Sequence, residues 1–424
     1  MLHKHLLQKL LIVAIFATLV SSCFKDTGTR TYKLYTPVYQ TTQTVRAAIK
    51  NDAPQPITSV GKMVLYGNYI FLNELNRGIH IIDNANPRNP INKAFIKIPG
   101  NENLAIKDNM LFADCYTDLL AIDITNADNI VLKNAVDNLF PERRYINGYQ
   151  MYFNTVITDW LVKDTTVNIV VEEGKGIWTK SGSYLTAAPW GWAFASGTAS
   201  SATSTTGING STSKYAIVNN FLYALSGNKI NTVSIIKTDD PKLVNTTTNN
   251  GSIETIFPLK DKLFIGAQAG MFIYSISNPA APVELGKFVH ARVCDPVIAD
   301  GNIAYVTLHS SQNRCIGFTN QLDVVDISNV SQPTIIKTYN LTSPYGLSKD
   351  SNLLFICDGA AGLKVFDATT ATNITLKQTL ASDETYDVIA FNGIAYVTAK
   401  DGLYQYSYAN TNNVQLISKT SIVK

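Results

Sequence analysis

The sequence predicts an all-β protein, namely a seven-bladed β-propeller built from four-stranded antiparallel blades. Three observations predict this fold. A pattern of short apolar strands occurs seven times, the copies follow one another at about 41 residues, and turns containing Asn and Gly connect the strands within a copy. Repeats of several short strands at roughly this spacing are typical of propellers, in which radial repetition leaves only short strand edges.

The repeat is defined by two independent landmarks. The third strand of each copy, here called strand C, ends at a small polar residue: Asp83, Asp123, Ser234, Ser275, Asp326, Asp367 and Ser407. The second strand of each copy, here called strand B, follows a tight turn. The second residue of that turn gives a parallel series: Asn68, Asn109, Asn220, Lys262, Asn302, Asn352 and Gly393. Successive members of both series lie about 41 residues apart except at two longer steps, so we expect seven copies of one unit with two insertions.

Within a copy the expected order is strand A, a tight turn such as 300–302, strand B, strand C, a Pro-rich turn such as 86–90, and strand D. Strands B and C are apolar at consecutive positions, as in 394–398. A strand with one wet face would alternate, so we expect both faces of strands B and C to be buried between neighbouring blades. The seventh copy has its own strand D at 414–417, so each blade is expected to come from contiguous sequence.

The strand C sequences resemble the LVIVD repeat, a propeller repeat of secreted bacterial and archaeal proteins. The clearest copy is 322–329, Leu-Asp-Val-Val-Asp-Ile-Ser-Asn, followed by Gln332-Pro333. The opening 32–39, Tyr-Lys-Leu-Tyr-Thr-Pro-Val-Tyr, is similar to lipoproteins of this repeat class from Bacteroidetes-type bacteria. The resemblance implies the propeller architecture and an exported, binding role, and it implies no established reaction.

The first residues predict export and lipid anchoring. Lys4 and Lys9 precede the apolar run 10–17 and a pair of serines, a pattern typical of a secretory signal peptide. The residues 19–23, Leu-Val-Ser-Ser-Cys, resemble a lipobox, which implies lipidation of Cys23. Acyl chains on this cysteine would make the membrane a partner and place the protein in the cell envelope, as an outer-membrane lipoprotein that is periplasmic or surface-exposed.

The expected organisation follows from these features. Residues 1–22 form the signal peptide, residues 23–57 form the lipidated cysteine, a tether and a possible edge strand, and residues 58–424 form the propeller. The formal net charge is only +3 over 424 residues, without a long run of Lys or Arg. We therefore expect no nucleic-acid partner.

The cysteines suggest one structural cross-link. In an oxidising compartment we expect Cys294 and Cys315 to form a disulfide that closes an enlarged B–C loop. With His290 and His309 they could instead bind zinc, but the spacings do not match a standard zinc finger, so we expect no metal and no cofactor. Cys115 and Cys357 are expected to be buried free thiols.

Both insertions are expected on one face of the disc, the face formed by the B–C loops and the D–A connections. The larger insertion, about 138–213, is a D–A connection between blades two and three, and it contains all four tryptophans. We expect a binding face that includes Trp178, Trp190 and Trp192 together with His290 and His309. The alternative is that the tryptophans form a small core of the insertion.

Three acidic residues occupy one position of the repeat, at the end of strand B: Glu74, Asp114 and Asp358. They could line the channel mouth and collect a cation. The alternative, which we favour, is that each carboxylate accepts backbone N–H groups of its own B–C turn.

No catalytic motif is recognisable, so the prediction is a non-enzymatic binding or scaffold protein for a protein partner or a glycan, acting through the insertion-bearing face. One alternative is a hydrolase or lyase of polysaccharides that uses Glu172, Glu173 or the repeated acids. Another is a structural envelope protein without a ligand.

Overall fold

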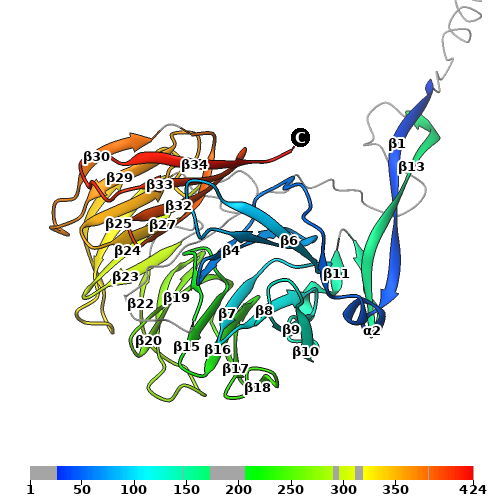
Figure 1. The fold of residues 1–424 in the computed structure, drawn as a ribbon, viewed down its shortest axis with the longest axis horizontal. Coiled ribbons are helices and arrows are strands. Elements are labelled where there is room, and N and C mark those ends of the chain that lie inside the picture. Colours follow the sequence, from blue (N-terminus) through cyan, green and yellow to red (C-terminus); the bar gives the residue numbers. More distant parts are fainter. Residues whose placement is uncertain are drawn as a thin grey trace, which may run out of the picture. The chain divides into compact units, whose positions relative to one another are not determined.

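The computed structural model describes residues 26–146, 148–171, 206–289, 296–310, 319–380 and 382–423. The chain divides into two compact units. One contains the described residues 26–38 and 159–171, and the other contains 39–158 together with the described residues from 206 onward. The second unit confirms the predicted fold: seven four-stranded antiparallel blades form a propeller ring (Figure 1).

The two inner strands of each blade carry most of the core. Strands A of successive blades contact one another from blade one to blade seven. They are β3 (Met63–Tyr66), β7 (Leu104–Lys107), β15 (Tyr215–Val218), β19 (Ile253–Leu259), β23 (Val297–Asp300), β27 (Leu347–Asp350) and β31 (Thr385–Phe391). Strands B are β4 (Tyr69–Glu74), β8 (Met110–Cys115), β16 (Phe221–Ser226), β20 (Lys262–Ala267), β24 (Ile303–Leu308), β28 (Leu353–Cys357) and β32 (Ile394–Ala399). Strands B are buried almost throughout, as the continuous apolar sequence predicts.

The outer two strands differ sharply from each other. Strands C are β5 (Gly78–Asp83), β9 (Asp118–Asp123), β17 (Lys229–Ser234), β21 (Gly270–Ser275), β25 (Gln321–Asp326), β29 (Leu363–Asp367) and β33 (Gly402–Ser407), and they are largely buried. Strands D are β6 (Ile91–Lys97), β10 (Val131–Val136), β18 (Lys242–Thr248), β22 (Val283–Val289), β26 (Thr334–Asn340), β30 (Thr375–Leu380) and β34 (Gln415–Ser421). Strands D are mostly exposed, because they form the rim of the disc.

One hydrogen bond explains why the two sequence landmarks keep the same spacing. In every blade, the backbone N–H just after strand C donates to the carbonyl of the turn residue just before strand B, for example Ile327 to Asn302 at 2.9 Å. The equivalent acceptor in blade four is Asp261, which binds the N–H of Ile276 at 2.8 Å. The choice of Lys262 as the landmark was therefore wrong by one residue, since Lys262 is already the first residue of β20.

The polar residue that ends strand C shapes the following turn. Asp326 accepts the N–H of Ser328 at 2.8 Å, and Asp83 accepts that of Ala85 at 3.0 Å. Such a side-chain bond to the amide two residues on stabilises a turn. Each strand D then contains one extra residue relative to strand C, at Lys93, Lys133, Val244, Leu285, Ile336, Lys377 and Ile417. A bulge at this point bends the outer strand and increases its twist.

Blade one has two additional strands. The tether contributes β2 (Asn51–Asp52) to its outer edge, where β2 pairs with β6. The end of the insertion contributes β14 (Ile208–Asn209), which pairs with the innermost strand β3. Blade one is consequently a six-stranded sheet in the order β14, β3, β4, β5, β6, β2.

The remaining elements flank the blades in sequence. Helix α2 (Thr42–Ala47) follows β1 (Asp26–Thr41), and the insertion begins with the 3-10 helix η1 (Pro141–Arg144) and the small hairpin β11 (Tyr145–Ile146) and β12 (Tyr149–Gln150). Strand β13 (Thr155–Val171) pairs with β1 in a two-stranded sheet, in which the hydroxyls of Thr31 and Thr166 lie 3.0 Å apart. No helix among the described residues is long and apolar enough to span a membrane.

Candidate functional site

The three repeated acids are buried, and each one holds the chain segment that leads into its own blade. Glu74 accepts the N–H groups of Thr58 and Ser59, both at 3.1 Å. Asp114 accepts those of Glu102 and Asn103 at 2.7 and 3.0 Å, and Asp358 accepts those of Thr342 and Ser343 at 2.9 and 2.8 Å. The acids thus accept backbone N–H groups as favoured above, but the donors precede strand A and do not come from the B–C turn.

Glu74 belongs to a compact charged group. The imidazole of His80 lies 2.9 Å from one carboxylate oxygen, and Arg77 and the hydroxyl of Thr58 bind the other. Burial raises the pKa of Glu74, but the bonds from His80 and Thr58 and the charge of Arg77 outweigh it and lower the pKa to about 2. The carboxylate is therefore ionised and committed to structure at neutral pH.

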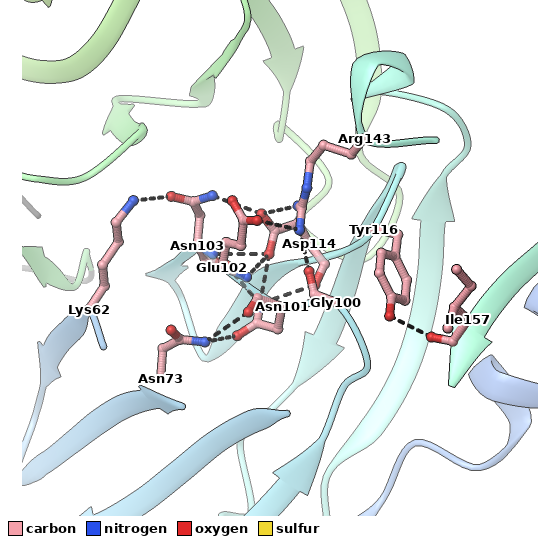
Figure 2. Close-up of polar contacts among 10 residues, drawn as sticks. All are labelled: Lys62, Asn73, Gly100, Asn101, Glu102, Asn103, Asp114, Tyr116, Arg143 and Ile157. Carbon is pink, nitrogen blue, oxygen red and sulfur yellow. Dashed lines mark hydrogen bonds and ion pairs between the residues drawn. The ribbon is translucent and has the colours of Figure 1, made fainter. Parts of the chain in front are cut away.

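Asp114 is the centre of a larger network, shown in Figure 2. Its carboxylate accepts the side-chain amides of Asn101 and Asn103, both at 2.8 Å, and the guanidinium of Arg143 at 2.8 Å. Arg143 also binds the carbonyl of Gly100. These contacts attach η1, the first element of the insertion, to blade two.

A buried lysine extends the same network. The ammonium of Lys62 donates to Oδ1 of Asn103 and is almost inaccessible to solvent. Burial and the nearby charge of Lys214 lower the pKa of Lys62 to about 7, although Glu102 and Asp114 oppose the shift. Among the residues that the structure describes, no group of three or more His, Cys, Asp or Glu is placed to hold a metal ion.

The structure brings together two of the predicted residues, His309 and Asp358, through Ser343. The hydroxyl of Ser343 lies 3.2 Å from Nδ1 of His309, and the backbone N–H of Ser343 binds Asp358. The ring of Tyr345 packs on the imidazole with centroids 4.3 Å apart. Burial lowers the pKa of His309, which favours the neutral imidazole, and a neutral ring with Nδ1 unprotonated can accept a hydrogen bond from the hydroxyl.

A small pocket lies at the seam between blades seven and one. It has a volume of about 150 Å³ and is lined by Thr58, Ser59, Val60, Leu75, Tyr386, Lys400 and Ile422. Tyr386 links the pocket to the His309 group, because its ring meets that of Tyr345 edge-on at 5.9 Å. The pocket is therefore connected to His309 through the two contacting rings of Tyr386 and Tyr345.

The insertion and the end of β1 present a set of aromatic side chains, all exposed except the half-buried Tyr149. They are here called the aromatic patch: Tyr39, Tyr145, Tyr149, Tyr152 and Phe153. Tyr152 and Phe153 expose 67% and 76% of their surface, and Tyr145 exposes 64%. The rings of Tyr39 and Tyr152 are 6.2 Å apart, and the Tyr39 hydroxyl donates to the carbonyl of Gln150 at 3.1 Å. Burial raises the pKa of Tyr39, as do its neighbours Tyr152 and Tyr149.

The frame that carries the aromatic patch is well packed. Phe140 is buried and stacks on Tyr215 of blade three with centroids 5.9 Å apart, and Val156 and Ile157 are buried as well. Arg46 of α2 donates to Asp118 at 2.7 Å and also binds Asp137. The patch is thus exposed, while the chain on either side of it is fixed to the propeller.

Several predicted residues lie outside the described part of the chain. They are Cys23, His290, Cys294, Cys315, Trp178, Trp190 and Trp192, together with Glu172 and Glu173. Their predicted roles, the disulfide and the lipid anchor among them, stay predictions. Cys115 and Cys357 are free and buried as expected, and burial raises the pKa of Cys115 to about 12.

Sequence reasoning missed the aromatic patch and Ser343. The sequence does indicate the patch, because 145–153 contains three tyrosines and one phenylalanine in nine residues. The predicted binding face included only the tryptophans of the insertion. No local signal marks Ser343, which reaches His309 from 34 residues away.

The structure is a seven-bladed β-propeller, and the comparisons add the repeat class. The LVIVD repeat family matches residues 59–95, 262–289 and 314–341, which fall in blades one, four and five. The chain therefore carries LVIVD repeats, as the strand C sequences predicted. No match is found among curated proteins.

Solved structures resemble this chain in fold alone. The computationally designed Ika8 protein is 11% identical, with 88% of this chain and 90% of Ika8 covered and a TM-score of 0.51. Sqt1 of Saccharomyces cerevisiae is 10% identical, with 88% of each chain covered and a TM-score of 0.50. A protein from Lactobacillus plantarum is 10% identical, with 80% and 88% covered and a TM-score of 0.51.

Proposed function

We propose that this protein is a binding or scaffold protein of the cell envelope, which docks a protein partner or a glycan through the insertion-bearing face. The observation that carries the proposal is the aromatic patch. Its most exposed members, Tyr152 and Phe153, offer large apolar surfaces to solvent. Exposed apolar groups of this size, gathered on a loop of a rigid scaffold, are typical of interaction sites.

The fixed frame favours tight binding. Aromatic anchors contribute most when they are presented in one conformation, because less freedom is lost on association. Thr155 donates to the carbonyl of Tyr152 through both its N–H and its hydroxyl, at 3.0 and 2.9 Å. The N–H of Thr42 likewise binds the carbonyl of Asn154 at 2.9 Å. These bonds fix the backbone that carries Tyr152 and Phe153.

Anchoring through Cys23 remains part of the proposal and is supported by the sequence alone. A lipid anchor would hold the propeller at a membrane surface, where a partner in the same envelope is met at high local concentration. Labelling cells with a radioactive fatty acid tests this point, with Cys23→Ala as the unlabelled control.

Affinity capture tests the function. The mature chain and the double variant Tyr152→Ser/Phe153→Ser are immobilised and exposed to envelope extract and to a glycan array. Leu376→Ser removes a similarly exposed side chain from the rim of blade six and serves as the matched control. We expect a ligand that the wild type and the control retain and the double variant loses. Equal retention by all three would contradict the proposal.

A further inference from the structure

Residues 206–213, here called the channel segment, form the end of the insertion and pair with the inner strands of the first two blades. In β14, Ile208 pairs with Leu65 and Asn209 pairs with Val64. The N–H of Gly207 donates to the carbonyl of Ile106 in blade two at 2.6 Å, next to a bridge between Lys107 and Thr206. The segment thus extends the sheet of blade one toward the axis.

The second half of the channel segment bonds to blades on other sides of the ring. The hydroxyl of Ser211 accepts the N–H of Leu347 in blade six at 3.1 Å. The hydroxyl of Thr212 lies 3.5 Å from Oδ2 of Asp387 in blade seven, and the carbonyl of Ser213 accepts the N–H of Ile256 in blade four at 3.0 Å. Ser211, Thr212 and Ser213 are all buried.

These contacts fix where the channel segment runs. Strands A of all blades surround the axis, and a single stretch of eight residues bonds to strands A or their edges in blades one, two, four, six and seven. Only a path through the central channel reaches all of them. The space that a propeller leaves along its axis is therefore occupied here by the chain itself.

Blades one and seven meet at a seam of the ring, and neither blade contributes a strand to the sheet of the other. Blade seven consists entirely of residues after 384, and strands A to D of blade one run from 63 to 97, so the two ends of the ring meet without sharing a strand. Contacts across the seam include the N–H of Val423 to the carbonyl of Ile57 at 2.8 Å, Gln405 to Asn84 at 2.7 Å, and a shared cluster of apolar side chains.

We propose that the channel segment is a built-in ligand of the axial channel and that it closes the ring, by fastening blades one and two to blades four, six and seven. It belongs covalently to blade three, which it directly precedes, so it joins the early part of the chain to the late part. The channel segment pairs with β3 of blade one as a peptide ligand pairs with a sheet edge, and its serine and threonine hydroxyls bond to blades six and seven.

A nicking experiment tests this proposal. A protease site is introduced after residue 190 of the full chain, and cleavage separates blades one and two from the channel segment and blades three to seven. The dissociation constant of the two halves is then measured. Asn209→Ala removes the side-chain amide that donates to the carbonyl of Leu104 in blade two at 2.8 Å, and Gly207→Val adds atoms where a Cβ would already lie 2.6 Å from Val64. Thr411→Val, an exposed change on a distant turn, is the control.

We expect the nicked wild type and the control to remain paired, and Asn209→Ala to raise the dissociation constant about tenfold. We expect a larger rise for Gly207→Val. If Gly207→Val does not fold, Asn209→Ala still decides the question. Halves that separate as soon as the wild type is cut, or that bind equally tightly in Asn209→Ala and the control, would overturn the proposal.

Discussion

The guanidinium of Arg143 donates to the buried carboxylate of Asp114 at 2.8 Å and thereby joins the start of the insertion to strand B of blade two. A second ion pair, to Glu102 at 3.2 Å, strengthens this attachment. Arg143 lies two residues before the β11–β12 hairpin, whose tyrosines belong to the aromatic patch. The position of the proposed binding surface thus depends on one arginine whose side chain is largely buried.

Replacement of Arg143 by Met is expected to lower the free energy of unfolding by about 3 kcal/mol, because Asp114 remains buried after losing its cation. The double variant with Asp114→Asn is expected to lose less than the sum of the single changes. Chemical denaturation measures these values, with the exposed Arg88→Met as the control. Additive single effects would show that the two side chains do not interact.

Glu74→Gln tests the charged group around His80. The pKa of Glu74 is lowered to about 2 in the folded protein, so its contribution to stability is complete above the ordinary pKa near 4.5 and is lost as the pH falls toward 2. In the wild type, protonation of Glu74 over this pH interval is expected to lower the free energy of unfolding by about 3 kcal/mol. The variant lacks this contribution at every pH. Unfolding curves at pH 5.5 and 2.5 provide the test. Asp239→Asn, which is exposed, should retain the full acid dependence.

Lys62→Met tests the opposite end of the pH scale. Folding lowers the pKa of Lys62 from 10.5 to about 7, so between these values the unfolded chain binds one proton more than the folded chain. Stability should therefore rise with pH in this interval, by up to about 1.4 kcal/mol per pH unit from this residue alone. The difference in unfolding free energy between wild type and variant, measured at pH 7 and 9.5, should change accordingly. A constant difference would refute the pKa shift.

The aromatic patch should be dispensable for folding. Tyr152→Ser and Phe153→Ser are each expected to change the free energy of unfolding by less than about 0.5 kcal/mol, because both rings are exposed. Thermal unfolding measures this effect. Deletion of 138–213 as a whole is a poor substitute, since it would also remove Phe140 from the core and Ser211 from the channel. A large loss of stability in either point variant would mean that its ring packs in the fold.

Much of the fold could be predicted because it rests on local chemistry repeated seven times. The end of each strand C could be located from residues such as Asp326, since the side chain that ends the strand also stabilises the next turn. The bond from Ile327 to Asn302 then fixes the distance between the two landmarks. Where the turn sequence was atypical, at 260–262, the same reasoning erred by one residue.

The site was less predictable because its contacts join distant parts of the sequence. The donors to Asp114 are at 102 and 103, before strand A, and its cation is at 143, inside the insertion. The repeat places an acidic residue at the end of strand B, but it does not show which backbone N–H groups the carboxylate accepts. The channel segment was missed for a related reason, since a stretch of small polar residues such as 209–213 is typical of a loop, and its partners in five blades are known only from the structure.

Site-specific photo-cross-linking in living cells tests the central claim most directly. A photoreactive residue replaces Phe153 in the aromatic patch, and in a second strain it replaces Thr411, on a C–D turn of blade seven. We expect a defined adduct, protein or glycan, from position 153 and none from position 411. The absence of any adduct at position 153, or the same adducts at both positions, would contradict a binding role for the insertion-bearing face.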